Sequence, residues 1–165
     1  MITTSKDDAY KAQCASNLKQ LITSVQIYRA SRDLEGVYGD QVQMGLPATP
    51  TIVGHKDGKV VFSTPWAPGL GTCMASLTPH AGGFEYQYGV LPAEFDTVGY
   101  FKARSEKQRE NTIIFLDFNH NPPDVPILQS GINKRIAFVR LSGQYQVVHS
   151  IYGYGNVAEL EELQF

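Results

Sequence analysis

The clearest periodic pattern in the chain lies between residues 6 and 32. Apolar side chains recur there at steps of three or four residues, a spacing that places them along one face of an α-helix. The members of this stripe are Tyr10, Cys14, Leu18, Leu21, Ile22, Val25 and Tyr28. The spacing predicts an amphipathic helix over residues 6–32, whose apolar stripe must pack on another part of the chain.

The pattern changes after residue 36, where Gly and Pro separate short runs of β-type residues. The runs 51–53 and 59–62 flank an Asp-Gly pair, which predicts a β-hairpin. Further strands are expected at 84–88, 112–118, 135–141 and 144–151, and short helices at 100–110 and 156–163. One long helix followed by hairpins is typical of an α+β fold, in which the apolar face of an antiparallel sheet covers the helix stripe.

The chain has 165 residues, and we expect a single domain over residues 1–165, with the sheet and its loops between residues 50 and 151. Its 14 basic and 16 acidic residues give a net charge of −2, which predicts no partnership with nucleic acid. Basic and acidic residues alternate between 102 and 110, and three glutamates lie at 159, 161 and 162. Both groups are typical of solvated helix faces.

The chain contains no apolar run that approaches the ~20 residues needed to span a bilayer. Residues 1–20 also lack the apolar stretch of a secretory leader. If Met1 is the natural start, these two observations predict a cytoplasmic protein.

Two segments carry a resemblance to a known family. Near the start of the chain, residues 13–21 read QCASNLKQL, with Tyr28 downstream. This segment resembles the C-x-x-N-L-[KR]-Q-[IL] pattern of bacterial pilin-like proteins, where it lies just after the membrane-spanning half of the first helix. Residues 133–145, which read NKRIAFVRLSGQY, resemble the late hairpin of the same family, and residues 84–89 resemble the aromatic strand that follows its Cys-Pro pair.

The chain departs from the family pattern at several points. Met74 replaces the Pro after Cys73, and Ser142 and Gln144 replace the Asp and His of the late hairpin. Residues 36–66 match nothing in the pattern. The hydrophobic N-terminal segment and the prepilin-peptidase cleavage motif of the family are absent. The resemblance therefore implies either the soluble headpiece of a longer protein or a relative that has lost its anchor, and we favour the first.

The resemblance implies a structural, non-enzymatic subunit of a type IV pilus or of a type II secretion pseudopilus. Its expected partners are other pilin-like subunits and a secretion or pilus assembly machine. The missing segment would anchor it in the inner membrane, with the headpiece in the periplasm or outside the cytoplasmic membrane. The polar face of the first helix would then contact neighbouring subunits through Lys11, Ser16, Lys19, Thr23 and Gln26. Ordinary solvation of this face remains an alternative, as does a soluble ligand-binding or enzymatic domain unrelated to filaments.

Oxygen ligands recur at alternate positions after the strand expected at 112–118, at Asp117, Asn119 and Asn121. Calcium favours such carboxylate and amide oxygens, and the resemblance adds the late-loop calcium site of major pseudopilins. The EF-hand template is not met, and Asx-type turn capping is the alternative role. We expect no cofactor other than this calcium. The four histidines show no zinc-ligand spacing, and a zinc site assembled only by the fold is the alternative.

The two cysteines, Cys14 and Cys73, belong to no C-x-x-C motif. A disulfide between them is one expectation, suited to an oxidising compartment. Two unrelated buried thiols are the other.

Overall fold

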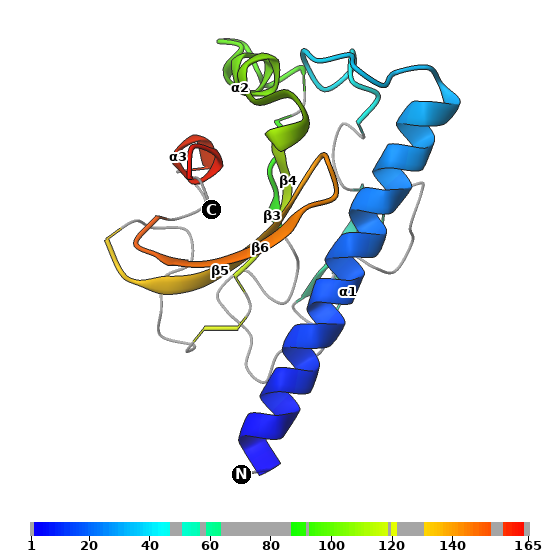
Figure 1. The fold of residues 1–165 in the computed structure, drawn as a ribbon. Coiled ribbons are helices and arrows are strands. Elements are labelled where there is room, and N and C mark those ends of the chain that lie inside the picture. The colour runs from blue at the N-terminus through cyan, green and yellow to red at the C-terminus, as the bar shows by residue number, and fades with distance from the viewer. Residues whose placement is uncertain are drawn as a thin grey trace.

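The computed structural model describes residues 2–46, 51–56, 59–63, 87–91, 93–118, 120–121, 131–152 and 157–163. The helices are α1 (Ile2–Ser31), α2 (Tyr100–Gln108), the 3-10 turn η1 (Arg109–Asn111) and α3 (Val157–Glu161). The strands are β1 (Thr51–Lys56), β2 (Lys59–Ser63), β3 (Gln87–Tyr88), β4 (Ile113–Asp117), β5 (Lys134–Arg140) and β6 (Tyr145–Ser150). The α+β class is confirmed, and each predicted helix has a counterpart within a few residues of its expected bounds (Figure 1).

The strands form two antiparallel sheets. β1 pairs with β2, which confirms the hairpin predicted around residues 57–58, although that turn lies outside the described residues. The larger sheet has the order β3-β4-β5-β6. Between β5 and β6, Gly143 has a φ of +95° and its N–H donates to the carbonyl of Arg140 at 2.8 Å. A residue without a Cβ suits this left-handed position, so a glycine closes the hairpin.

α1 crosses one face of the larger sheet and contacts β4, β5 and β6 (Figure 1). Its predicted stripe is confirmed, because Cys14, Leu18, Leu21, Ile22 and Val25 are at most 2% exposed. They pack against the side chains that the sheet presents on this face, which include Phe115, Ala137 and Val139. The apolar area removed from water is what holds the helix on the sheet.

The opposite face of the sheet is covered as well. Leu116, Ile136 and Phe138 point away from α1 and pack against Val157 and Leu160 of α3. The sheet therefore has helices on both faces, whereas the sequence led us to expect a single covered face. β4 is buried at every position, in keeping with the apolar run at residues 113–116, and the burial includes the charged Asp117 at its end.

The long helix carries no membrane-spanning segment within its described part. Among the described residues, no helix of the structure combines the length and the apolar character needed to cross a bilayer.

Truncating the stripe of α1 tests this packing. We expect Leu21→Ala to lower the free energy of unfolding by about 2–5 kcal/mol, because the deletion leaves a cavity between α1 and the sheet. Thr23→Ala is the matched control, since Thr23 is exposed and should change stability by less than about 0.5 kcal/mol. Urea unfolding followed by circular dichroism measures both. Equal losses from the two variants would contradict the packing described.

Candidate functional site

The face of α1 turned away from the sheet is the first candidate site. It is exposed and mostly polar or small, and the exposed positions are Asp8, Ala9, Ala12, Gln13, Ser16, Lys19, Gln20, Thr23, Ile27 and Ala30. Ile27 differs from the other exposed residues of this face because it has a large apolar side chain, which is 65% exposed. Single exposed apolar side chains are common on protein surfaces, so Ile27 defines a position to test on this face. Ile27 lies outside the apolar stripe of α1 in the sequence, so the helical periodicity already indicates its exposure.

The five residues predicted as an assembly face do not all lie on this exposed face. Ser16, Lys19 and Thr23 are exposed, whereas Lys11 and Gln26 are half-buried. The amide of Gln26 donates to the carbonyl of Leu141 at 2.9 Å, and the ammonium of Lys19 lies 5.2 Å from the ring centre of Tyr145. Gln26 and Lys19 therefore lie beside the β5–β6 hairpin. Ser16 and Thr23 are exposed to solvent.

A second candidate lies where α1 ends. Arg29 is buried, and its Nη2 donates to the carbonyls of Leu34 at 2.7 Å and Val37 at 2.8 Å. Within the described part of the chain its Nη1 has no hydrogen-bond partner. Burial lowers the pKa of this guanidinium, while Glu110 opposes the shift. Arg29 thereby holds the segment after α1 onto the helix.

The same end of α1 borders a pocket of about 420 Å³. Gln26, Arg29, Glu35, Glu110 and Leu141 line it. Its carboxylates exceed its cations by one, so an anionic ligand would meet repulsion here. The hydroxyl of Tyr38 donates to Glu110 at 2.6 Å, and burial together with this bond raises the pKa of Tyr38.

A buried ion pair joins α2 to α3. Nε and Nη2 of Arg104 each donate to a carboxylate oxygen of Glu161 at 2.7 Å, with the two side chains 7% and 0% exposed. Arg104 also donates to the carbonyls of Gly89 and Ile113, and the Ile113 N–H donates to Glu161 at 2.7 Å. The prediction that residues 102–110 and 159–162 form solvated helix faces is therefore wrong for Arg104 and Glu161. These two residues lie 57 positions apart in the sequence and form a buried pair.

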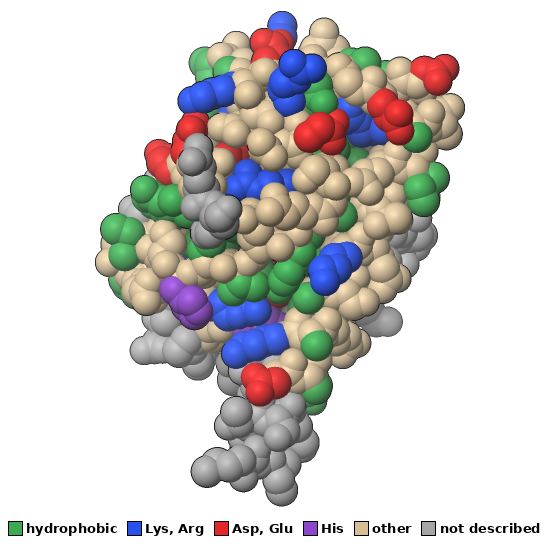
Figure 2. Space-filling view, viewed as in Figure 1, with side chains coloured by type: hydrophobic (Ala, Val, Ile, Leu, Met, Phe, Trp, Pro, Cys, Tyr) green, Lys and Arg blue, Asp and Glu red, His purple; other side chains and the backbone are tan. Residues whose placement is uncertain are grey.

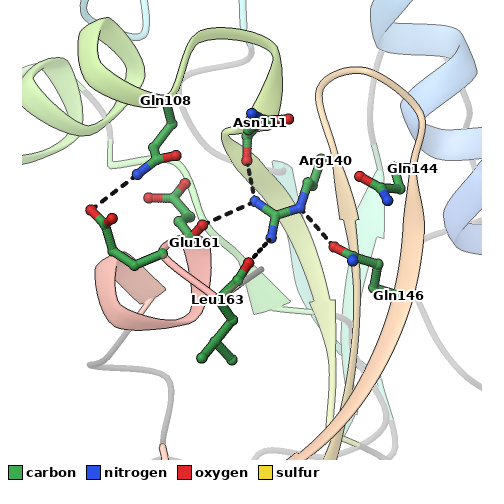
Figure 3. Close-up of a pocket in the computed structure, with 8 residues that line it drawn as sticks. Gln108, Asn111, Arg140, Gln144, Gln146, Glu161 and Leu163 are labelled. Carbon is green, nitrogen blue, oxygen red and sulfur yellow. Dashed lines mark hydrogen bonds between the residues drawn. The ribbon is translucent and has the colours of Figure 1, made fainter. Parts of the chain in front are cut away.

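A polar pocket of about 380 Å³ lies beside this ion pair (Figure 3). Its centre is Arg140, whose guanidinium donates to Gln146 Oε1 at 2.7 Å and to the carbonyls of Asn111, Glu161 and Leu163. Figure 3 shows all three nitrogens engaged. A ligand would therefore meet amide and carboxylate groups, and an anion could claim Arg140 only by breaking these bonds. Burial lowers the pKa of Arg140.

The predicted calcium ligands are engaged in different contacts. The Asn121 amide donates to the carbonyls of Phe118 and Arg135, and its oxygen accepts from the Arg135 N–H at 2.7 Å. This is the bridging role that turn-forming asparagines commonly play. Asp117 instead faces His120, with 3.7 Å between Oδ2 and Nε2. Asn119 lies outside the described residues, so the calcium site stays a prediction.

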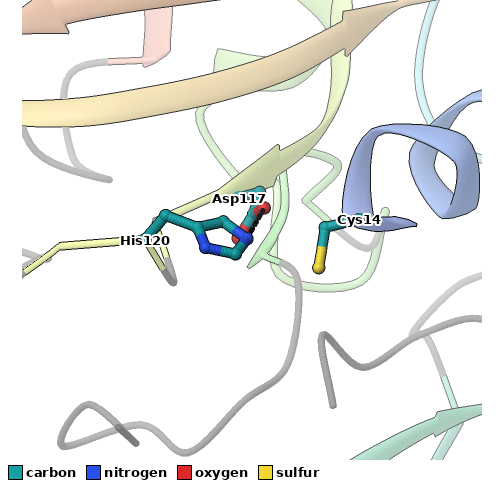
Figure 4. Close-up of side chains that lie close together, drawn as sticks. All are labelled: Cys14, Asp117 and His120. Atoms are coloured by element: carbon teal, nitrogen blue, oxygen red, sulfur yellow. Dashed lines mark ion pairs between the residues drawn. The ribbon is translucent and has the colours of Figure 1, made fainter. Parts of the chain in front are cut away.

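Asp117 and His120 also approach Cys14 of α1 (Figure 4). One ligand atom from each of the three residues lies within 4.8 Å of the other two, and the side chains are almost completely buried. The sulfur of Cys14 is in a disulfide. Cys73, the second cysteine of the chain, lies outside the described residues, so the pairing of the two stays a prediction.

Charges on the visible surface are mixed in sign. Figure 2 shows acidic and basic side chains interspersed over the α2 end of the molecule, without a field of one sign. This agrees with the small net charge.

Neutralising Glu161 tests the buried ion pair. We expect Glu161→Gln to lower the free energy of unfolding by about 3–5 kcal/mol, because Arg104 keeps a buried charge without its counter-charge. The matched control is Glu162→Gln, which removes the exposed pair with Lys107 and should cost about 0.2–1 kcal/mol. Chemical denaturation of both variants gives the comparison, and similar losses would show that the Arg104–Glu161 pair is not buried as described.

Comparisons of the chain with protein-family models, with curated proteins and with solved structures gave no match.

Proposed function

We propose that this protein is a pilin-like subunit of a bacterial pilus or pseudopilus, closest to the pseudopilins of type II secretion, and that it assembles through α1. The observation that carries the proposal is the one-sided packing of α1. One face of this helix of 30 residues is buried on the sheet, and the other is exposed over several turns. Its first turns extend past the sheet in Figure 1, where a preceding membrane segment would continue the helix.

The pilin-like resemblance at residues 13–21 falls on this same helix. In the proposed filament, the exposed face of α1 lies against neighbouring subunits. Burial of the apolar side chain of Ile27 in that contact would favour assembly. Thr23 lies one turn before Ile27 and Ser16 about three turns before it on the same face, and their small polar side chains let two helices approach closely. The protein has a scaffolding role in protein transport or attachment, and its partners are subunits of the same class and their assembly machine.

The natural coding sequence upstream of residue 2 gives the first test. We expect the reading frame to continue into a segment of about 20 apolar residues, long enough to cross a bilayer. A Gly should precede this segment and a Glu should lie a few positions into it. DNA sequencing of the upstream region decides the matter. A stop codon immediately before Met1 would contradict the anchored subunit and favour a soluble binding or enzymatic domain.

Site-specific crosslinking tests the assembly face itself. A photoreactive amino acid at Ile27, introduced into the complete protein in its host, should give a ladder of crosslinked oligomers on irradiation, because this position faces a neighbouring subunit. The control position is Glu106 on α2, which is similarly accessible, with its side chain 51% exposed. Equal crosslinking from both positions, or none from Ile27 in cells that make the protein, would reject assembly through α1.

A further inference from the structure

Three metal-ligating side chains converge beneath α1. Cys14 comes from the buried stripe of the helix, Asp117 from the last position of β4, and His120 from the residues that follow (Figure 4). Their side chains are 1–2% exposed. They come from two parts of the chain more than 100 residues apart, so their sequence spacing gave no sign of a site.

The donor set suits a thiophilic divalent cation. Thiolate, imidazole and carboxylate are the three ligand types that zinc takes in proteins, with metal–ligand distances of about 2.0–2.3 Å. Tetrahedral geometry at those distances separates the ligand atoms by about 3.5 Å. The atoms here lie within 4.8 Å of one another, and the Asp117–His120 pair is already at 3.7 Å. A contraction of about 1 Å, within the range of side-chain rotation, would close the site.

The charges also balance. A dication bound by one thiolate, one carboxylate and one neutral imidazole forms a neutral unit, which lowers the desolvation penalty of burying it beneath the helix. A bound metal would contact both Asp117 and His120, whose Oδ2 and Nε2 now lie 3.7 Å apart. The fourth position of the tetrahedron is left for water or another donor.

The oxidation state of Cys14 decides whether this set is complete. In the structure the sulfur of Cys14 is part of a disulfide, and a disulfide sulfur carries no thiolate charge for a metal. Reduction breaks the S–S bond, adds two electrons and two protons, and yields two thiols. A thiol or phosphine reductant supplies the electrons and is itself oxidised. The metal then displaces the proton of the Cys14 thiol, which passes to solvent.

We propose that Cys14, Asp117 and His120 form a redox-gated metal site, closed while Cys14 is in a disulfide and able to bind zinc or a similar thiophilic dication once Cys14 is reduced. The inference rests on the geometry of these residues and is independent of the filament proposal. It also differs from the calcium prediction, because it uses sulfur and nitrogen donors and shares only Asp117.

Cobalt(II) is the probe, because a thiolate–cobalt bond produces a near-ultraviolet charge-transfer band and a tetrahedral site produces visible bands. The protein is titrated with cobalt in three forms: oxidised, reduced with a phosphine, and as the Cys73→Ser variant without reductant. We expect both bands in the reduced form and in Cys73→Ser, and neither in the oxidised form. The Cys73→Ser result also tests the predicted pairing of the two cysteines.

Ligand variants identify the donors. In the reduced protein, His120→Gln and Asp117→Asn should each weaken cobalt binding by more than about 10-fold, which is the loss that removal of even an outer-shell partner can bring. His149→Gln is the matched control, because His149 lies exposed on β6 and should leave binding unchanged. Cys14→Ser should abolish the charge-transfer band while leaving Cys73 in place.

Each other result overturns the inference. Binding by the oxidised protein would show that the disulfide does not close the site. Unchanged binding in His120→Gln would place the metal elsewhere, for example on Cys73. Circular dichroism is recorded on the same samples, and a reduced protein that unfolds and is not refolded by cobalt also excludes the site, because its ligands meet only while α1 stays on the sheet.

Discussion

The two-sided burial of β4 is the constraint on which the rest of the described structure depends. All five of its residues are buried. Ile114 and Phe115 belong to the core under α1, Ile113 and Leu116 belong to the core under α3, and the pairing with β5 is irregular between Ile113 and Phe115. A strand in this position has no face available for polar residues, which is why its sequence is continuously apolar up to Asp117. Because β3 and β5 pair with it on either side, β4 also sets the register of the larger sheet.

The sequence predicted the elements whose signals are local. The stripe from Cys14 to Val25 depends on spacings of three and four residues, so it could be read without knowing what covers it. The unbroken run at 113–116 indicated a buried strand in the same way. The burial of the other face of the larger sheet by α3 was harder to predict. This helix is short, and its apolar residues Val157 and Leu160 contact the sheet only in the folded chain.

The candidate sites were harder to predict than the fold, and the reason is the same in each case. Arg104 and Glu161 each lie in a charged helix, where solvation is the usual expectation, and only the tertiary structure brings them together. The sequence predicted Asp117 as a calcium ligand together with Asn119 and Asn121, its neighbours along the chain. Its neighbours in space are His120 and Cys14 of α1. Chemistry that joins distant segments leaves no periodic trace in a sequence.

The distance along the chain between Arg104 and Glu161 has a consequence for how the protein is made. The ribosome adds Arg104 57 residues before it reaches Glu161, and the strands β4, β5 and β6 are all synthesised before that carboxylate. Until then the guanidinium would be buried without a counter-charge, and closing the structure around it would be unfavourable. Closure of the α2 end around Arg104 therefore becomes favourable only after α3 has emerged and Glu161 can pair with the guanidinium.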